Sequence, residues 1–484
     1  MSTMIKKLHK QIQSGEKTSE EICREYLGKI KEQNEELNAF IEVYEEEEIL
    51  EQARKVDEKV KKGEKIKLLE GIPCGIKDLI NIQGKKTTAG SKMMENYVAS
   101  EDAEVIRRLK KEGVIFVGKA NLDEFAMGAS GENSAFGPTK NPHDITRVPG
   151  GSSSGSAVAV ASKMIPWALG TDTGGSIRQP SGFCGVVGMK PTYGRVSRRG
   201  VFPMATSYDQ VGPIAQTVED AAIILRAIAG EDKQDNTTIK ESNLENKLEE
   251  LDGNLKGVKI GYVKEFFEKE GLDDDVRDLV KGRIDWANEQ GAEIVEVKLP
   301  NFKYSLATYY LMITSEVSSN MARIDGIRFG FNEMVDGAGE SKNLLDVYKK
   351  SRSEGLGEEV QRRIVLGTYA LSAGYYDAYY KKAQAVRELI KDDLRKAFEK
   401  VDFIIAPTSP TPAFKLGDKT DDPLAMYLAD IYTVTANVAM IPAIAIPAGT
   451  VEREGKELPV GMQLLGKWWD DWKLLSWAKG FEID

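Results

Sequence analysis

The chain has 484 residues, of which 41% are hydrophobic and 29% are charged, a composition typical of a globular protein. No stretch approaches the roughly 18 unbroken apolar residues of a membrane span. The formal net charge of -10 disfavours tight binding of the chain itself to a phosphate backbone, because such binding depends on clustered Lys and Arg. These features argue against a membrane protein and against a simple nucleic-acid-binding module.

Cysteine and histidine narrow the chemistry further. The three cysteines are far apart and odd in number, which predicts a reducing, cytoplasmic location without a disulfide framework. No apolar segment follows the first lysines, so no signal peptide is predicted. The only histidines are His9 and His143, so a Ser-His-Asp enzyme would need one of them as its base, and a histidine-rich metal site is almost excluded. We therefore predict no metal site.

The predicted elements begin with helices. The residues at 18–21 fit a capping box, and a second helix is expected at 45–62, so residues 1–65 should form a polar helical layer. Beyond it, strand-like and helix-like segments alternate, which favours an α/β sheet covered by helices on both faces. Strands are expected at 71–80, 114–118, 185–188, 258–263, 293–297, 403–406, 441–447 and 458–465, and helices at 102–112, 274–289, 307–323 and 357–400.

One segment interrupts this pattern. Residues 232–255 are polar and mixed in charge, which predicts a mobile insertion, with a domain boundary as the alternative. Strands resume beyond it without repeating the earlier pattern, and no internal repeat is present. A single domain over residues 1–484 is therefore expected.

Two Gly/Ser runs, at 150–156 and 170–176, lie beside apolar segments. The first run could be a flexible linker, but it leads directly into the apolar residues 157–161, which indicates an ordered neighbourhood. In the second run Ser176 follows two glycines and could lie on a tight turn whose N–H groups converge on an oxyanion. That is the geometry of an acyl-transfer nucleophile, whereas an isolated Gly-Gly-Ser is more often an ordinary turn.

Lys77 is the candidate base for such a serine. It lies in an apolar, strand-like segment, and burial lowers the pKa of a lysine. Moving that pKa from about 10.4 to near 7 requires roughly 5 kcal/mol, which desolvation can supply. The alternative is a lysine at a strand end whose stem packs while its ammonium group reaches water.

Together these motifs resemble the amidase-signature family of Ser-cisSer-Lys hydrolases. The family implies a single large mixed β-sheet covered by helices, with Ser176 as nucleophile, Ser152 in a cis peptide as proton relay, and Lys77 as base. The implied oxyanion hole is formed by the backbone N–H groups of Thr173, Gly174 and Gly175. Ser154 stands where the family usually has Gly. The resemblance also extends through 71–73, 76–78, 121–128, 183–197, 209–213, 362–364, 374–380 and 458–463.

Within the family, the chain most resembles the glutamine-hydrolysing subunits of tRNA-dependent amidotransferases. A free amino acid needs a carboxylate for its ammonium group and a cation for its carboxylate. The resemblance offers Asp430 and Arg363, although a helix-surface ion pair is the alternative role for Arg363. Whether Arg362 points inward instead, and which neighbouring tyrosine takes part, is left open by the sequence. The implied substrate-binding residues are Met127, Gly128, Tyr309, Tyr310, Arg363 and Asp430.

The same resemblance implies partners. Glutamine would be hydrolysed here, and ammonia would pass to a kinase/transamidase partner, assembled with a small third protein of the amidotransferase. The kinase/transamidase would bind ATP, Mg²⁺ and most of the tRNA, so no cofactor is expected in this chain. The alternatives are a stand-alone amidase for small or aryl amides that uses the same three residues, and a scaffold protein that has lost catalysis.

Overall fold

One mixed β-sheet forms the centre of the protein. The computed structural model describes residues 3–240, 248–328 and 330–482, and within them eleven strands pair in the order β1-β3-β2-β4-β6-β5-β10-β11-β9-β7-β8. The strands are β1 (Phe40–Val43), β2 (Pro73–Lys77), β3 (Ile115–Ala120), β4 (Trp167–Asp172), β5 (Val187–Lys190), β6 (Gln210–Ala215), β7 (Lys259–Tyr262), β8 (Glu293–Glu296), β9 (Phe403–Pro407), β10 (Ala443–Arg453) and β11 (Lys456–Gly466). Strand β2 is parallel to β3 and β4. The neighbouring strands in the run β4-β6-β5-β10-β11-β9 pair antiparallel.

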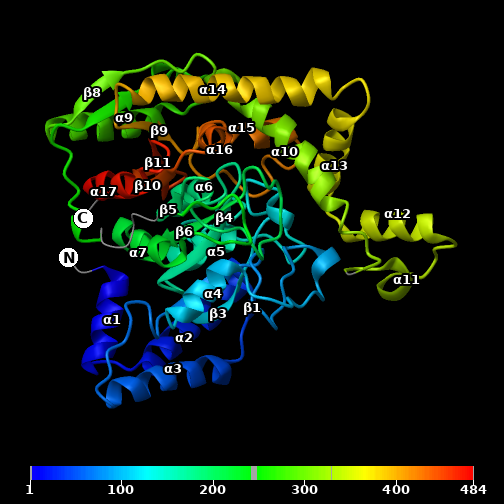
Figure 1. The fold of residues 1–484 in the computed structure, drawn as a ribbon, viewed down its shortest axis with the longest axis horizontal. Coiled ribbons are helices and arrows are strands. Elements are labelled where there is room, and N and C mark those ends of the chain that lie inside the picture. Colours follow the sequence, from blue (N-terminus) through cyan, green and yellow to red (C-terminus); the bar gives the residue numbers. More distant parts are fainter. Residues whose placement is uncertain (1–2, 241–247, 329, 483–484) are drawn as a thin grey trace.

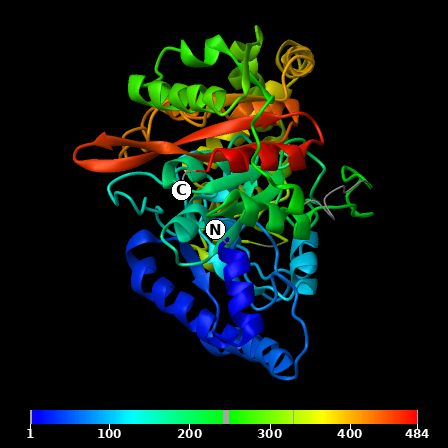
Figure 2. The same cartoon turned by 90° about the vertical axis from the view of Figure 1, so that its left-hand side faces the viewer.

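Helices surround this sheet, as Figures 1 and 2 show. Those up to α9 are α1 (Met4–Ser14), α2 (Ser19–Leu37), α3 (Glu46–Lys61), α4 (Glu104–Lys111), α5 (Ser154–Ala161), α6 (Arg178–Cys184), α7 (Val218–Ile228), α8 (Lys264–Phe267) and α9 (Asp274–Glu289). The others are α10 (Ser305–Met321), α11 (Glu333–Asp336), α12 (Leu344–Gly355), α13 (Glu358–Leu371), α14 (Lys382–Phe398), α15 (Pro423–Leu428), α16 (Val434–Ala439) and α17 (Asp471–Gly480).

Strand β11 shows that both faces of the sheet are covered. Its Gly461 lies against Gly182 of α6, and its Gly466 lies against Leu474 of α17. Because successive side chains of a strand point to opposite faces, residues 461 and 466 face opposite ways. The predicted α/β sheet with helices on both faces is confirmed.

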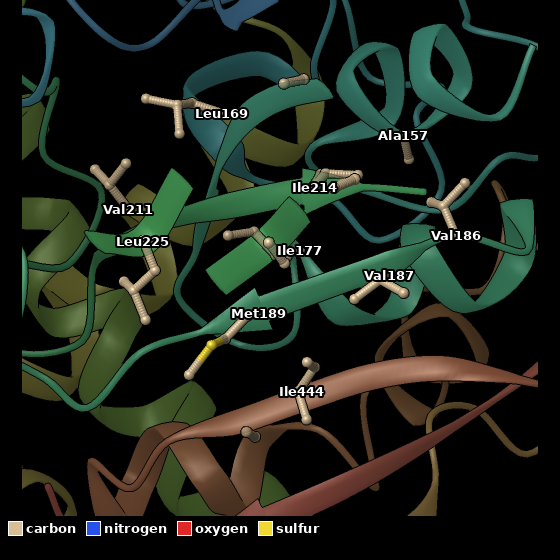
Figure 3. Close-up of a cluster of buried hydrophobic side chains, with 14 of the residues drawn as sticks. Ala157, Leu169, Ile177, Val186, Val187, Met189, Val211, Ile214, Leu225 and Ile444 are labelled. Carbon is tan, nitrogen blue, oxygen red and sulfur yellow. The ribbon is translucent and has the colours of Figure 1, made fainter. Parts of the chain in front are cut away.

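The core around the central strands fixes the turn that precedes α6. Figure 3 shows Ile177 among apolar side chains from β4, β5, β6 and β10. Three glycines make room for it, because a Cβ atom at Gly170, Gly188 or Gly212 would lie 3.1, 2.8 or 3.0 Å from the Ile177 side chain. The residue that follows Ser176 is therefore anchored by close packing within the sheet.

Most predicted elements are present, with local differences. The capping box is confirmed, since Thr18 Oγ1 accepts the Glu21 N–H at 3.0 Å and the Glu21 carboxylate accepts the Thr18 N–H at 2.7 Å. The strand expected at 185–188 begins two residues later, because Gly185 ends α6 in a left-handed conformation with φ 69°. The sequence patterns also do not predict β1 or β6.

The prediction of one helix over 357–400 is wrong. The chain forms α13, then a π-helical turn over Asp377–Lys381, and then α14. Helix α13 ends because Ser372 has an extended backbone (φ -70°, ψ 157°) and its hydroxyl donates back to Tyr369 O at 2.7 Å. Gly374 then turns the chain with φ 86°, a conformation that glycine adopts without steric cost.

The segment 232–255 is only partly described, because residues 241–247 lie outside the described residues. At its start, Asp232 and Asp235 are buried and pair with Arg199 and Arg198 at 3.1 Å each. Among the helices of the described chain, none has both the length and the apolar character that crossing a bilayer requires.

Candidate active site

Lys77 lies at the end of β2, fully buried, with its amine against three hydroxyl groups. Its Nζ is 2.8 Å from Ser152 Oγ, 3.0 Å from Ser153 Oγ and 2.8 Å from Thr171 Oγ1. The structure therefore brings the predicted base and the predicted relay serine into direct contact. Ser153 and Thr171 are contacts that the sequence patterns do not indicate.

The surroundings of Lys77 favour a neutral amine. Burial lowers the pKa of Lys77 to about 7, although the buried carboxylates of Asp123, Asp172 and Asp209 act in the opposite direction. At neutral pH a substantial fraction of the amine therefore carries a lone pair. This is the state in which a lysine can accept a proton.

The hydrogen bonds around Lys77 orient that lone pair. Ser153 Oγ accepts the Thr171 N–H at 3.2 Å and donates to Thr171 O at 3.1 Å, so its own proton is already committed. Ser153 must then accept a hydrogen from Lys77. A neutral amine has two hydrogens to donate, and the second has Thr171 Oγ1 as its acceptor. In a neutral amine that donates to Ser153 and Thr171, the lone pair faces the hydroxyl of Ser152, which lies 2.8 Å from Nζ.

Ser152 itself follows a cis peptide bond with Gly151. The Gly151 N–H donates to Gln179 Oε1 at 2.9 Å, and Ser152 O accepts the Asp123 N–H at 3.3 Å. Ser154, by contrast, contacts Thr139 Oγ1 at 3.2 Å. The serine after the cis bond that reaches Lys77 is therefore Ser152.

Ser176 lies beside these serines at the end of the second Gly/Ser run. Its carbonyl accepts the Ser153 N–H at 3.0 Å, and 7% of the residue is exposed. Both preceding glycines are needed for space. A Cβ at Gly174 would lie 2.3 Å from Tyr309 Oη, and one at Gly175, where φ is 135°, would lie 2.2 Å from Thr433 Oγ1.

The N–H groups of this turn divide into two sets. The Gly175 N–H, one of the predicted oxyanion donors, is hydrogen bonded to Asp172 Oδ1 at 2.9 Å. Within the described residues, the N–H groups of Thr173, Gly174 and Ser176 form no hydrogen bond. The donors open to an oxyanion at this turn are therefore those of Thr173, Gly174 and Ser176, whereas the Gly175 N–H stabilises the turn.

A buried ion pair between Asp172 and Arg178 flanks the turn that carries Ser176. Asp172 and Arg178 are both fully buried, with Arg178 Nε 3.0 Å from Asp172 Oδ2. Burial acts to raise the pKa of Asp172, but Arg178, together with Lys190 and the hydrogen bond from Asn437, outweighs burial and the pKa is lowered. Arg178 Nη1 also donates to Thr433 O at 3.0 Å and to Gln463 Oε1 at 2.6 Å. The pair thus ties the turn to β11 and to the residues before α16.

On the substrate side, the two candidate arginines have different positions. Arg363 is buried, and its Nε is 2.7 Å from Glu359 Oε1. Arg362 pairs with the same carboxylate, but 36% of its side chain is exposed. Burial lowers the pKa of the Arg363 guanidinium, but Glu359 and the surrounding tyrosines together outweigh burial and raise that pKa. Arg363 is therefore the arginine that points inward.

The two neighbouring tyrosines, Tyr309 and Tyr310, make different contacts. Tyr310 donates to Asp430 Oδ2 at 3.0 Å, and the Arg363 guanidinium lies 5.5 Å from the centre of its ring. Tyr309 packs instead over Gly174. Burial raises the pKa of Asp430 to about 7, against the hydrogen bond from Tyr310 and the charge of Arg363. Tyr310, Arg363 and Asp430 thus form one cluster.

A cavity of about 480 Å³ opens beside this cluster. Gly128 and Arg363 line it, but Lys77, Ser152 and Ser176 are not among its lining residues, and Met127 is fully buried. Ser130, which lines the cavity, lies against the residue that precedes Ser152, since a Cβ on Gly151 would lie 2.9 Å from Ser130 N. The lining residues are Lys92, Glu124, Gly128, Ser130, Glu132, Asn133, Ser134, Ala135, 354–359, Arg362, Arg363, Lys419, Thr420, Pro423, Met426 and Tyr427.

Comparison with known proteins identifies the group to which the chain belongs. A family model described as Amidase matches residues 21–475. The chain belongs to the amidase family. It is therefore an amidohydrolase, and its single mixed sheet covered by helices is the amidase-signature fold.

Two relatives of this amidase carry the name of the A-subunit of glutamyl-tRNA(Gln) amidotransferase. That of Caldanaerobacter subterraneus subsp. tengcongensis is 51% identical over 483 residues, and that of Geobacillus thermodenitrificans is 50% identical over 478 residues. Each alignment covers 99% of this chain and 96% of the relative.

Solved structures show the same likeness. The crystal structure of the glutamyl-tRNA(Gln) amidotransferase A-subunit from Thermotoga maritima is 41% identical with a TM-score of 0.78, covering 96% of this amidase and 91% of that chain. The native peptide amidase from Stenotrophomonas maltophilia is 31% identical with a TM-score of 0.81, covering 99% and 96%.

Several contacts of this amidase were not predicted from its sequence. Glu359 precedes Arg362 by three residues and Arg363 by four, a helical spacing that could have indicated the shared carboxylate. Ser130 gives no such signal, because its position depends on the loop around Gly151. Its buried hydroxyl has no hydrogen-bond partner in the described part of the chain. In the same residues, no group of three His, Cys, Asp or Glu side chains is placed to hold a metal ion.

Proposed function

We propose that this amidase hydrolyses the side-chain amide of glutamine and delivers ammonia to a partner that amidates glutamate, or aspartate, on a mischarged tRNA. The observation that carries the proposal is that one chain holds both the Lys77–Ser152 contact and the cluster of Tyr310, Arg363 and Asp430, with a cavity lined by Arg363 beside the cluster. The Lys77–Ser152 contact is suited to amide hydrolysis, and the charged cluster is suited to binding the ammonium and carboxylate groups of an amino acid. The names of the relatives point in the same direction.

In the proposed reaction Ser176 Oγ attacks the amide carbon of glutamine. The proton of Ser176 passes to Ser152 Oγ while the proton of Ser152 passes to neutral Lys77, because a hydroxyl can donate and accept at once. The negative charge that develops on the amide oxygen faces the N–H groups of Thr173, Gly174 and Ser176. When the carbon–nitrogen bond breaks, Lys77 returns its proton through Ser152 and ammonia leaves. Water then hydrolyses the γ-glutamyl ester by the same proton path, which releases glutamate.

Substrate recognition would use the buried charges. In its ionised form Asp430 would pair with the α-ammonium group of glutamine, and Arg363 would pair with its α-carboxylate. Tyr310 holds Asp430 in place through the hydrogen bond of 3.0 Å. Gly128 and Ser130 line the cavity next to this pair and would contact the aliphatic part and the amide of the substrate.

The partners complete the proposal. A kinase/transamidase partner would bind ATP, Mg²⁺ and most of the tRNA, and the small third protein of the amidotransferase would join the two, in the cytoplasm. This chain would act as one amidase domain over residues 1–484 and would need no cofactor of its own. Its net charge of -10 fits a protein that leaves the tRNA phosphates to its partner.

A stand-alone amidase for small or aryl amides is the second candidate. The likeness to a peptide amidase at a TM-score of 0.81 favours it. Such an enzyme would use Lys77, Ser152 and Ser176 in the same way but would not need Arg363 or Asp430.

One assay separates the two functions. Glutamine and butyramide, which lacks the α-ammonium and α-carboxylate groups, are given to the wild-type chain and to Arg363→Ala, with and without its copurifying partner, ATP and mischarged tRNA. We expect glutamine to be strongly preferred, and Arg363→Ala to lose at least about 100-fold in kcat/KM for glutamine but little for butyramide, because an ion pair is lost. Equal use of both amides would favour the stand-alone amidase.

A further inference from the structure

A buried carboxylate links the catalytic part of the site to the helix that carries Arg363. Glu124 begins a 3₁₀ turn over Glu124–Ala126 and is 3% exposed. One of its oxygens accepts the Gly357 N–H at 2.8 Å, and the other accepts the hydroxyl of Ser91. The proposed reaction does not use this group.

On the catalytic side, the backbone around Glu124 is firmly held. Its N–H donates to Asn133 O at 2.7 Å, and the N–H of the next residue, Phe125, donates to Ala89 O at 2.7 Å. The preceding Asp123 donates its N–H to Ser152 O at 3.3 Å. The carboxylate of Glu124 therefore extends from a segment that is bonded directly to the relay serine.

On the other side, Glu124 meets the start of α13. Gly357 precedes the first residue of this helix and, as a glycine, has no side chain with which to cap it. A carboxylate at a helix N-terminus is favoured by the helix dipole. The fit is close, since a Cβ at Gly357 would lie 2.4 Å from Glu124 Oε2. Arg363 lies in the second turn of the same helix.

Glu124, Gly357 and Arg363 also line the same cavity. Glu124 is thus placed where it sets the distance between two parts of one site. Ser152 is held on one side through Asp123, and Arg363 is held on the other through α13. Burial raises the pKa of Glu124 to about 7, against the hydrogen bonds from Ser91 and Gly357.

We infer that Glu124 is a positioning residue that fixes the N-terminus of α13, and with it the Arg363 guanidinium, relative to the catalytic serines. The inference rests on the proposed function, because it assigns Arg363 to the α-carboxylate of the substrate. Glu124 then acts on substrate binding rather than on proton transfer. Its loss weakens the binding of glutamine and leaves the chemical step largely intact.

The test measures kcat and KM for glutamine, with butyramide as the comparison substrate. Glu124→Ala is expected to raise KM for glutamine about 10-fold, the effect of losing a hydrogen bond to a charged group, with kcat and the butyramide rate changed less than about 2-fold. Glu124→Gln keeps an acceptor for the Gly357 N–H and should restore KM to within about 3-fold of wild type. Gly357→Ala places a Cβ atom 2.4 Å from Glu124 Oε2 and so displaces the Glu124 carboxylate. This variant should raise KM as Glu124→Ala does.

Glu354→Ala is the matched control, because Glu354 lines the same cavity but is exposed. It should leave KM unchanged. The inference is overturned if Glu124→Ala lowers kcat without raising KM, if glutamine and butyramide lose equally, or if Glu124→Gln is as impaired as Glu124→Ala. Additive effects of Glu124→Ala and Arg363→Lys would also overturn it, since coupled residues are non-additive. If the wild-type chain with its partner hydrolyses no glutamine, the proposed function fails instead.

Discussion

The amine of Lys77 is the group on which the proposed chemistry depends, and its environment makes a pH prediction. Because burial lowers its pKa to about 7, the neutral form increases as pH rises through that value. We expect kcat at saturating glutamine to rise with pH through about 7 and then level off. Lys77→Arg, which stays protonated, should reduce kcat by at least about 100-fold at every pH.

Burial raises the pKa of Asp430 to about 7, so Asp430 titrates in the same pH range as Lys77. Asp430 acts on substrate binding, so measuring kcat at saturating glutamine separates its titration from that of Lys77. Asp430→Asn should therefore raise KM while the ascending limb of kcat stays in place. A kcat profile that is flat between pH 6 and 8, on the order of one unit either side of that pKa, would contradict the role of Lys77 as base.

The two hydroxyl groups that accept hydrogens from Lys77 give a second prediction at this scale. Ser153→Ala and Thr171→Val each remove one acceptor, so the lone pair is no longer held toward Ser152. We expect each to lower kcat about 10-fold with KM unchanged, measured by initial rates with glutamine. Ser154→Ala, whose hydroxyl contacts Thr139, is the control and should stay within about 2-fold of wild type.

Among the elements, the buried pair of β4 and α6 makes a stability prediction. Arg178→Met leaves the Asp172 carboxylate buried without its partner, and the pair is fully enclosed. The free energy of unfolding should fall by about 3–5 kcal/mol in denaturant titrations. Lys55→Met breaks the exposed pair with Glu51, in which 67% and 63% of the side chains are exposed, and should cost less than about 1 kcal/mol. A similar small loss in both variants would refute this role of the Asp172–Arg178 pair.

The elements also show how far the sequence could be read. Hydrophobic pattern and capping residues located most strands of the described chain and the helices α2, α3, α4, α9 and α10, because burial of one face decides these elements, but they did not predict helices such as α5, α6 and α7. Pattern failed over 357–400, where a helical spacing continues past Ser372 although its backbone and Gly374 end the helix. Only one of the hydroxyl groups that contact Lys77 was predicted. The resemblance to the family motif predicted the contact with Ser152, whereas Thr171 contacts Lys77 only because β4 pairs with β2.

At the scale of the whole molecule, the sheet joins distant parts of the chain into one site. Lys77 comes from β2, Ser176 follows β4, Arg363 lies on α13 and Asp430 precedes α16. Figure 1 shows α13 crossing on the opposite side of the molecule from α1, α2 and α3. The proposed catalytic and recognition parts are thus built from different regions, which the hydrogen bond between Glu124 and Gly357 connects.

The central claim is that Ser176 forms a γ-glutamyl ester during hydrolysis of glutamine. The most direct measurement mixes the amidase and its partner with glutamine, quenches the reaction in acid during turnover, and locates the acyl group by mass spectrometry of the digested chain. We predict a γ-glutamyl group on the peptide that contains Ser176, absent from Ser176→Ala, which should also lose at least about 1,000-fold in kcat. A glutamyl group on another residue, or full glutamine hydrolysis by Ser176→Ala, would contradict the account.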